Sequence, residues 1–415
     1  MAERAPHLLL VPAFLGGHGG LENHVLSFAR VAAGAGYRVS VVTPRPIPAG
    51  GDLTPRLASV ATVDDAERHW RASIGGRAAR LAAGARTIAV ERRPLPAARR
   101  ASLALDRARP YLDRYWQGPG AALVRDADVV HAFGKPKAFV RGVVVAAADA
   151  GTPVVYNEIA QVTPAYAHRS DLAPFARVVD RCDHVVTISE SQEADLRARF
   201  GYTGPVTVVE QWADGLEDDL LAIDRPQRPS GAPVVVGSLS RLSPEKGLET
   251  LLDAVARTGD RVRLRIAGTG GLDGELRARV ARLGLGGRVE LVGYVEDRVA
   301  FYRDLDVFVV ASIEEGGPIT GAEAMAAGLP VVTTPCGAMA DRVRGGHEGL
   351  RFAAGDAEAL ATALDRLAAD PALGRSLGEA ARARYLARNA AHENTARLLG
   401  LWSNLRGRAP SEVGA

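Results

Sequence analysis

The sequence is poor in cysteine and in aromatic residues. The first shortage excludes some kinds of site, and the second indicates what the cores are made of. Only two cysteines, Cys182 and Cys336, occur in 415 residues, and they lie far apart. We therefore expect neither a disulfide framework nor a cysteine-based zinc site, and the cytoplasm is the expected location. Aromatic residues make up 5% of the chain while glycine occurs 45 times. We expect cores of valine, leucine and alanine joined by many tight turns.

The chain also lacks a large net charge and a long apolar run. Its formal net charge of +3 is too small to indicate nucleic-acid binding. No stretch approaches the roughly 18 apolar residues of a membrane span. The short apolar run at residues 7–15 contains Pro12 and is followed by glycines. We interpret it as a β-strand rather than a signal peptide.

Short apolar runs alternate with amphipathic stretches along most of the chain. The runs are residues 7–11, 38–43, 128–132, 153–156, 184–188 and 206–209, and then 234–237, 263–267, 288–291, 307–310 and 330–333. Buried parallel strands separated by helices are typical of a doubly wound α/β architecture. A proline-rich break between the two sets of strands predicts a linker.

We therefore predict two Rossmann-like domains facing across a cleft. The first domain is expected over residues 1–215, the linker over 216–232 and the second domain over 233–385. Residues 386–415 are expected to form a helix, with a tail, that packs back on the first domain. Ligands of such sheets bind at the carboxyl ends of the strands, which places the expected site in the cleft.

The most informative passage joins two glutamates through a glycine turn. The sequence EGGPITGAE runs from Glu315 to Glu323 and leads into a helix that we expect to begin near Ile319. A helix N-terminus presents free N–H groups and a positive dipole end, which suits a diphosphate. The backbone expected at that diphosphate belongs to Gly317, Ile319 and Thr320. Helix capping is the alternative explanation, but it does not call for a glutamate before the glycines.

This passage resembles the E-x7-E motif of the family 4 glycosyltransferases, which are retaining enzymes of the GT-B fold. The sequence EAMAAGLPVV that follows is similar too, and the resemblance spans nearly the whole chain. It implies transfer of a sugar from a nucleoside diphosphate, by default uridine diphosphate, to an acceptor held mainly by the first domain. It also implies Glu315 at the sugar hydroxyls and Glu323 at the ribose.

Two cations follow the first strand of the second half. Arg241 and Lys246 can both face a pyrophosphate and neutralise its charge as it leaves. Cations near a helix start are unfavourable for the helix dipole, which favours anion binding over a solvated surface. The segment resembles the GRLxxxKG of the family, with Ser240 where glycine is usual.

Three further loops carry donor-site candidates. Gly19 and Gly20 belong to a glycine loop that lacks the dinucleotide fingerprint but resembles the N-terminal glycine loop of the family. The resemblance brings them beside the diphosphate. Gly268, and the pair Tyr294 and Val295, follow strands where the family holds the nucleobase and ribose. Ordinary turn chemistry explains each of these short segments equally well.

The acceptor side of the expected site is less complete. His131 lies near the carboxyl end of a strand-like run, so we expect it at the cleft, as an acceptor contact, a proton-transfer group or a hydrogen-bonded cap. Glu158 precedes Ile159, which stands where many relatives have a histidine that contacts the donor sugar. Either the donor sugar is held differently, or Glu158 or His131 takes over part of that role.

No metal or other cofactor is predicted. The two D-x-D patterns, Asp126–Asp128 and Asp304–Asp306, each lead directly into an apolar run, so turn chemistry accounts for them. Arg241, Lys246 and the helix dipole already supply positive charge for a diphosphate.

The acceptor itself is not encoded in an obvious motif. We expect a small soluble acceptor such as an aminocyclitol or another natural-product core. A cell-envelope or lipid-linked acceptor is the alternative, supported by the arginine-rich stretch 68–114, which solvated helix faces also explain. A nucleotide-sugar epimerase and a non-catalytic nucleotide-sugar-binding protein are the rival functions, the latter favoured by Ile159. The missing fingerprint disfavours a nicotinamide oxidoreductase.

Overall fold

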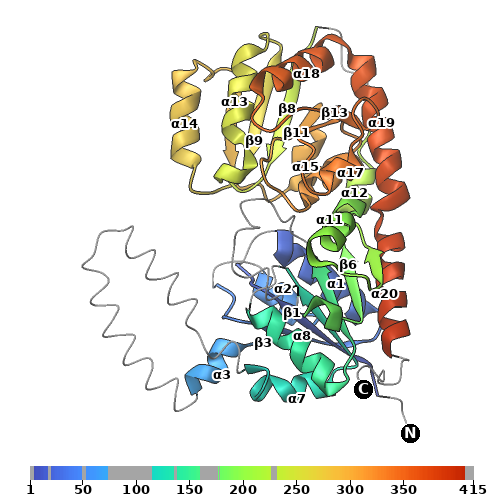
Figure 1. Cartoon of the computed structure of the whole chain (residues 1–415). Helices are drawn as coiled ribbons and strands as arrows, with labels where there is room; N and C mark the ends of the chain where they lie inside the picture. Colours follow the sequence, from blue (N-terminus) through green and yellow to red (C-terminus); the bar gives the residue numbers. More distant parts are fainter. Residues whose placement is uncertain are drawn as a thin grey trace, which may run out of the picture.

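The structure is a computed structural model that describes most of the chain. The described residues are 4–16, 20–48, 53–72, 115–134, 138–158, 176, 178–225 and 231–406. Two α/β domains lie one above the other in Figure 1, and two helices near the end of the chain run down one side of both.

Each domain is built on one parallel sheet. The first has the order β3-β2-β1-β4-β5-β6-β7, and the second β10-β9-β8-β11-β12-β13. The strands of the first sheet are β1 (His7–Pro12), β2 (Arg38–Thr43), β3 (Thr62–Asp65), β4 (Val129–Phe133), β5 (Val154–Glu158), β6 (His184–Thr187) and β7 (Val206–Val208). Those of the second are β8 (Val234–Leu239), β9 (Val262–Ala267), β10 (Val289–Gly293), β11 (Val307–Val310), β12 (Val331–Thr333) and β13 (Gly349–Arg351).

Every strand predicted from an apolar run is confirmed, with ends that move by at most two residues. Two strands were not predicted, namely β3 and β13, and both lie at the edge of their sheet. Their sequences, TVDD and GLR, contain a single large apolar residue each and so carry no continuous apolar run. The predicted GT-B architecture of two Rossmann-like sheets is confirmed by this topology.

Helices cover both faces of the first sheet. One face is covered by α1 (Gly20–Gly34) and α2 (Leu53–Ala58), and the other by α7 (Pro119–Asp126), α8 (Ala138–Ala150) and α11 (Glu190–Phe200). The short helices α3 (Ala66–Ala72) and η1 (Val179–Arg181) complete the described part of the domain. Neighbouring residues of one strand enter opposite cores, as Val129 and Val130 of β4 show.

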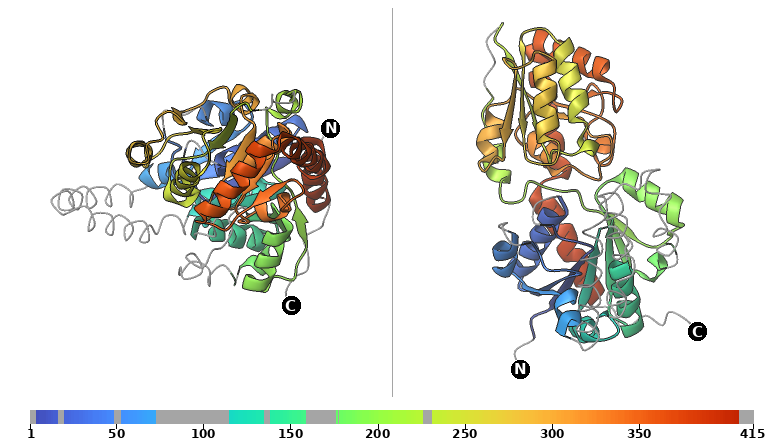
Figure 2. Two further views of the ribbon diagram at one scale, coloured as in Figure 1. Left: turned by 90° about the horizontal axis from the view of Figure 1, so that it is seen from above. Right: turned by 90° about the vertical axis from the view of Figure 1, so that its left-hand side faces the viewer.

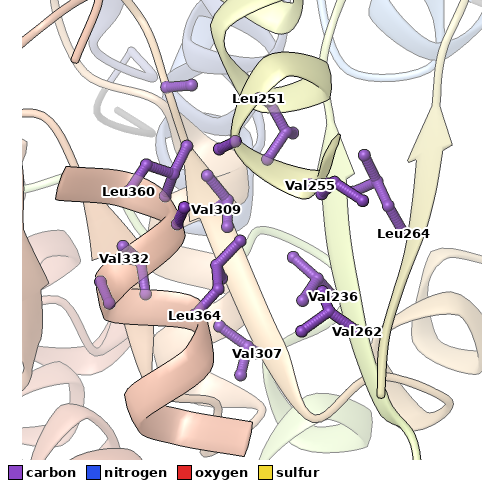
Figure 3. Packing of buried hydrophobic residues seen from close by; sticks show 14 of the residues in the cluster. Val236, Leu251, Val255, Val262, Leu264, Val307, Val309, Val332, Leu360 and Leu364 are labelled. Carbon is purple, nitrogen blue, oxygen red and sulfur yellow. The ribbon is translucent and has the colours of Figure 1, made fainter. Parts of the chain in front are cut away.

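The second sheet is sandwiched in the same way. On one face it carries α13 (Leu248–Arg257), α14 (Asp273–Arg282) and α18 (Ala357–Ala369). On the other lie α12 (Glu217–Leu221), α15 (Arg298–Arg303), α16 (Ile319–Ala326), α17 (Met339–Arg342) and α19 (Pro371–Arg388), while η2 (Pro244–Lys246) precedes α13. Figure 3 shows the first of these cores, where Leu251 and Val255 of α13 and Leu364 of α18 meet the valines of the strands. Burying each such side chain stabilises the fold by roughly 1.5–3 kcal/mol.

The chain crosses between the domains twice. After β7 it enters the second domain, and α12, inside the predicted linker, already packs against that domain through Leu220. It returns through α19 and α20 (Ala391–Arg406). In Figure 1, α19 lies beside the second domain and α20 lies beside the first, and Figure 2 shows the same two helices from other sides. α20 packs into the core of the first domain through Leu398 and Trp402. Among the described helices, none combines the length and apolar character that crossing a bilayer requires.

Candidate functional site

A pocket of about 210 Å³ lies between the two domains at the carboxyl ends of their strands. α1 of the first domain contributes Gly20 and Asn23, and loops of the second domain supply the rest. Of the residues proposed from the sequence, the pocket brings together Gly20, Arg241, Lys246, Glu315, Gly317, Ile319 and Thr320. Residues from segments that are far apart in the sequence therefore line one site.

One wall of the pocket is the start of α16. The helix begins at Ile319, as expected, and its N-cap residue Pro318 gives no side-chain hydrogen bond to the first turn. The positive end of the helix dipole therefore faces the pocket without a capping carboxylate. Because Ile319 and Thr320 line the pocket, this helix end can receive an anion.

An ion pair joins the two loops that carry the chemistry. Lys246 Nζ contacts Glu315 Oε2, and both side chains are mostly buried. Ser312 Oγ lies 3.5 Å from the same carboxylate oxygen. The pair holds a cation and a hydrogen-bond acceptor side by side at the pocket wall. Arg241 is exposed and contacts Glu245 at 3.1 Å, so its guanidinium lies at the pocket mouth.

The second glutamate of the motif lies deeper than the first. Glu323 is 1% exposed, Arg298 Nη1 lies 2.5 Å from its Oε1, and the Tyr302 hydroxyl donates to its Oε2 at 2.8 Å. Burial and the neighbouring Glu323 carboxylate raise the pKa of Tyr302, so the phenol stays protonated and donates. The side chain that lines the pocket at this end is Arg298, and Glu323 orients it.

Arg298 was not identified from the sequence. It follows Asp297, whose carboxylate caps α15 by accepting from the backbone N–H of Ala300. An arginine in the first turn of a helix resembles a solvated surface residue, so only the fold shows that it faces the pocket.

Gly268 has a structural role that its tripeptide does not reveal. Its φ is +125°, and a Cβ at this position would lie 1.9 Å from the carbonyl oxygen of Ser240. Only glycine lets the loop after β9 pack against the backbone beside Arg241. Tyr294 is 67% exposed and Val295 is half-buried at the end of β10, and neither lines the pocket. Gly19 lies outside the described residues.

His131 is not at the cleft, and that expectation is wrong. It is the third residue of β4, fully buried, and its Nδ1 accepts a 3.1 Å hydrogen bond from Trp402 Nε1 of α20. Its ring stacks on Phe133 at 4.5 Å and meets Phe28 edge to face. Because side chains alternate along a strand, the third position points into the core rather than along the strand to its end. Burial lowers its pKa well below the ordinary value.

Glu158 and His24 lie near the carboxyl end of β5. Glu158 is 4% exposed, and the Tyr156 hydroxyl lies 2.9 Å from its Oε2. His24 of α1 is 3% exposed, and its Nε2 lies 3.0 Å from Asn157 Oδ1. Burial lowers the pKa of His24 to about 4. Ile159 and residues 73–114 of the arginine-rich stretch lie outside the described residues.

The D-x-D aspartates have structural partners. Asp128 accepts from the backbone N–H of His7 at 2.6 Å, and Asp306 accepts from that of Val235 at 2.8 Å. Asp126 pairs with Arg38 at 2.5 Å. The turns before β4 and β11 thus tie each strand to its neighbour, as turn chemistry predicts.

A larger cavity of about 730 Å³ lies elsewhere, between α7 and α8. Its lining is mainly apolar, with Arg125, Arg141 and Asp149 as the charged members. None of the proposed donor-site residues lines it. Although it is larger, we place the candidate site in the smaller pocket, because a helix N-terminus and several cations converge there.

Comparison with known proteins finds a family model that matches each half of the chain. Residues 18–214 match the model of glycosyltransferase family 4, and residues 233–370 match that of glycosyl transferases group 1. The lipopolysaccharide core biosynthesis glycosyltransferase LpsE of Rhizobium meliloti (strain 1021) is 36% identical over 162 residues, which cover 39% of this chain and 47% of that protein. The chain thus matches less than half the length of this relative.

Two further proteins are similar over longer regions. The lipopolysaccharide core biosynthesis mannosyltransferase LpcC of Rhizobium leguminosarum bv. viciae is 30% identical over 250 residues, 56% of this chain and 68% of that protein. The crystal structure of Anabaena Alr3699/HepE in complex with UDP has a TM-score of 0.71 at 20% identity, over 96% of this chain and 100% of that chain. That likeness shows the shared GT-B fold. Two family models in tandem and a relative matched over two thirds of its length lead to one conclusion: the chain belongs to the family 4 glycosyltransferases.

Proposed function

We propose that this protein transfers a sugar from a nucleoside diphosphate to a hydroxyl group of an acceptor. The observation that carries the proposal is the convergence of the α16 N-terminus, Arg241, Lys246 and Glu315 in one pocket between the domains. A diphosphate needs positive charge and N–H donors, and a sugar needs hydrogen-bond acceptors. This pocket offers all three within one small volume.

The diphosphate binds against the start of α16. The N–H groups of Ile319 and Thr320 donate to it, and Arg241 and Lys246 neutralise the charge that grows as it departs. The first domain closes this end of the pocket through Gly20. These charges supply the electrostatic stabilisation for which other transferases use a divalent metal, so the proposed reaction needs none.

The donor sugar lies beside the Lys246–Glu315 pair. Glu315 accepts from sugar hydroxyls, and Lys246 holds the carboxylate in place. Departure of the diphosphate leaves oxocarbenium-like character at the anomeric carbon. The acceptor hydroxyl attacks from the same face, passes its proton to the leaving phosphate and so retains the anomeric configuration. Glu323 acts at the ribose through Arg298, which lines the pocket and which Glu323 orients.

Uridine diphosphate is the proposed carrier. The support is the resemblance to the family and the likeness to a GT-B structure described as a complex with UDP. Base recognition is assigned to the loops at Gly268 and at Tyr294 and Val295, which follow β9 and β10 of the second sheet.

A cell-envelope saccharide is the proposed acceptor, ahead of the small soluble acceptor that the sequence alone favoured. The support is that both relatives described above are named for lipopolysaccharide core biosynthesis. The acceptor enters from the first domain, where Asn23 lines the pocket and Glu158 lies at the end of β5. A non-catalytic protein that binds a nucleotide sugar is the second candidate.

A thermal-shift panel tests the donor first. Nucleotide sugars of different base and sugar are compared with free UDP, GDP, ADP and NAD(P). A ligand at a hundred times its dissociation constant stabilises the fold by about 2.7 kcal/mol. Stabilisation by one nucleotide sugar and its diphosphate supports the proposal, and stabilisation by NAD(P) alone contradicts it.

Turnover separates the enzyme from the binding protein. Lipid-linked and lipopolysaccharide core saccharides are offered with the preferred donor, and diphosphate release and the anomeric configuration of the product are followed by NMR. Arg241→Ala is expected to raise the activation free energy of turnover by roughly 2–4 kcal/mol. Glu323→Ala is expected to weaken the binding free energy of the donor by a similar amount, roughly 2–4 kcal/mol. Wild-type donor affinity and turnover in both variants would show that the site is misplaced.

A further inference from the structure

A buried group of charges lies where the first domain meets the second. Glu210 follows β7 and is 2% exposed. Arg384 of α19 donates to its two carboxylate oxygens at 2.9 and 3.2 Å, and Arg388 Nε lies 3.3 Å from one of them. Arg342 of α17, which is 0% exposed, lies 3.8 Å away through its Nε. The mechanism described above uses none of these residues.

Arg342 extends from this charge group to the diphosphate end of the pocket. Its Nη1 donates to the carbonyl oxygen of Pro318 at 3.1 Å, and its Nη2 donates to Gln211 Oε1 at 3.4 Å. Pro318 is the N-cap residue of α16, and Gln211 belongs to the crossing from the first domain. One guanidinium therefore joins the crossing segment to the helix end that receives the diphosphate.

The loop before α16 is also held from the first domain. Gln192 Nε2 of α11 lies 3.5 Å from the carbonyl oxygen of Gly316. A Cβ at Gly317 would lie 2.4 Å from Gln211 Oε1 and 2.3 Å from Ile188 Cδ1. This loop therefore packs directly on Ile188 and Gln211, with no room for a side chain at Gly317.

We propose that Arg342 is a positioning residue for the diphosphate: through Pro318 and Gln211 it holds the α16 N-terminus in register with the first domain. This inference rests on the proposed function, because it concerns the same diphosphate. Burial of Arg342 is a cost to folding, and burial lowers its pKa. A planar guanidinium compensates by donating to two acceptors at once, which lysine cannot do with the same geometry.

Removal of Arg342 leaves the rest of the charge group paired. Glu210 keeps Arg384 and Arg388, so Arg342→Met strands no buried carboxylate and is expected to fold. Arg342→Lys retains the charge and is the second variant. Arg225 provides a matched control at the opposite end of the same helix, since its Nε donates to the carbonyl oxygen of Ala327, the C-cap residue of α16.

The test compares a ligand that has the diphosphate with one that lacks it. Binding of UDP is measured by calorimetry and that of uridine by NMR titration, with GDP and guanosine in their place if the wild-type chain prefers guanine. We expect Arg342→Met to weaken UDP binding about tenfold and to leave uridine binding unchanged, with a smaller loss for Arg342→Lys. Arg225→Met is expected to lower the melting temperature and keep the wild-type ratio of the two affinities.

Two outcomes overturn the inference, and they differ. If the folded Arg342 variants keep the wild-type ratio of UDP to uridine affinity, Arg342 is a structural residue only. If the wild-type chain itself does not prefer the diphosphate to its nucleoside, the proposed function fails and the inference fails with it.

Discussion

Lys246 and Glu315 lie 69 residues apart in the sequence, yet they form one ion pair in the pocket. Neither residue type is unusual by itself. Lys246 lies in η2 after β8, and Glu315 lies in the loop after β11. These strands are neighbours in the sheet, which brings the two residues together. Charge that develops on a departing diphosphate is stabilised most by groups that are already in place, because no reorganisation is then needed.

Lys246→Met is therefore expected to lower kcat by about 10²–10³-fold, as the loss of an oriented charge at a developing anion typically does. Steady-state kinetics with a saturating donor measures this. Arg257→Met, a change to an exposed arginine at the other end of α13, is the control and should retain wild-type kcat. A Lys246→Met enzyme within threefold of wild type would exclude Lys246 from the reaction.

His24 makes stability depend on pH. The unfolded chain binds a proton at its ordinary pKa of 6.5, while the folded chain does so only near 4. Between these values the unfolded state binds more protons, so stability falls as the pH falls from 6.5 toward 4. From pH 7 to pH 5 this residue accounts for about 2 kcal/mol of lost stability.

His24→Gln keeps a donor for Asn157 and removes the titration. Urea unfolding at pH 7 and pH 5 should show a pH dependence smaller by about 2 kcal/mol than in the wild type. If the pH dependence of stability were the same in His24→Gln as in the wild type, His24 would take up its proton at the same pH in the folded and unfolded chains. That result would contradict the prediction.

At the scale of elements, the apolar runs predicted the central strands because parallel strands are buried on both faces. The runs did not show which side each residue faces, and that is why His131 was expected at the cleft. The E-x7-E passage was placed correctly at a helix start, since glycine and proline before an apolar stretch mark such a start. The partners of Glu323 were not predictable, because Tyr302 and Arg298 reach it from another helix.

The loop that holds Arg241 depends on a glycine in the neighbouring loop. Gly268→Ala would place a Cβ 1.9 Å from the carbonyl oxygen of Ser240 at a backbone φ of +125°. We expect this variant to weaken donor binding at least tenfold, about 1.4 kcal/mol, by displacing the Arg241 loop. Gly271→Ala, where nothing lies within 4 Å, is the control. Isothermal titration with UDP distinguishes them, and equal affinities would contradict the role given to Gly268.

At the scale of the whole molecule, the returning helix was predicted from its position at the end of the sequence, but its anchor was not. Trp402 is fully buried, and its indole N–H donates to His131 in the core of the first domain. The burial of Arg342 was not predicted either, because in the sequence an arginine in a four-residue helix resembles a surface residue. Both side chains are buried by contacts with segments that are distant in the sequence, and such contacts cannot be predicted from the local sequence.

Trp402→Ala is expected to destabilise the first domain by roughly 3–5 kcal/mol, through the cavity it leaves and the lost hydrogen bond. Chemical denaturation followed by circular dichroism measures the effect. Leu386→Ala, at a side chain that is 45% exposed on α19, should cost less than 1 kcal/mol, in the usual range of surface changes of about 0.5 kcal/mol. A similar small loss for Trp402→Ala would mean that α20 does not anchor in the first domain.

The central claim is that the pocket between the domains binds the diphosphate of a nucleotide sugar. A crystal structure of the wild-type protein with UDP tests it most directly. The account predicts the diphosphate at the start of α16, within hydrogen-bond distance of the Ile319 and Thr320 N–H groups and of Lys246 or Arg241. UDP bound elsewhere, such as in the cavity between α7 and α8, would contradict the account.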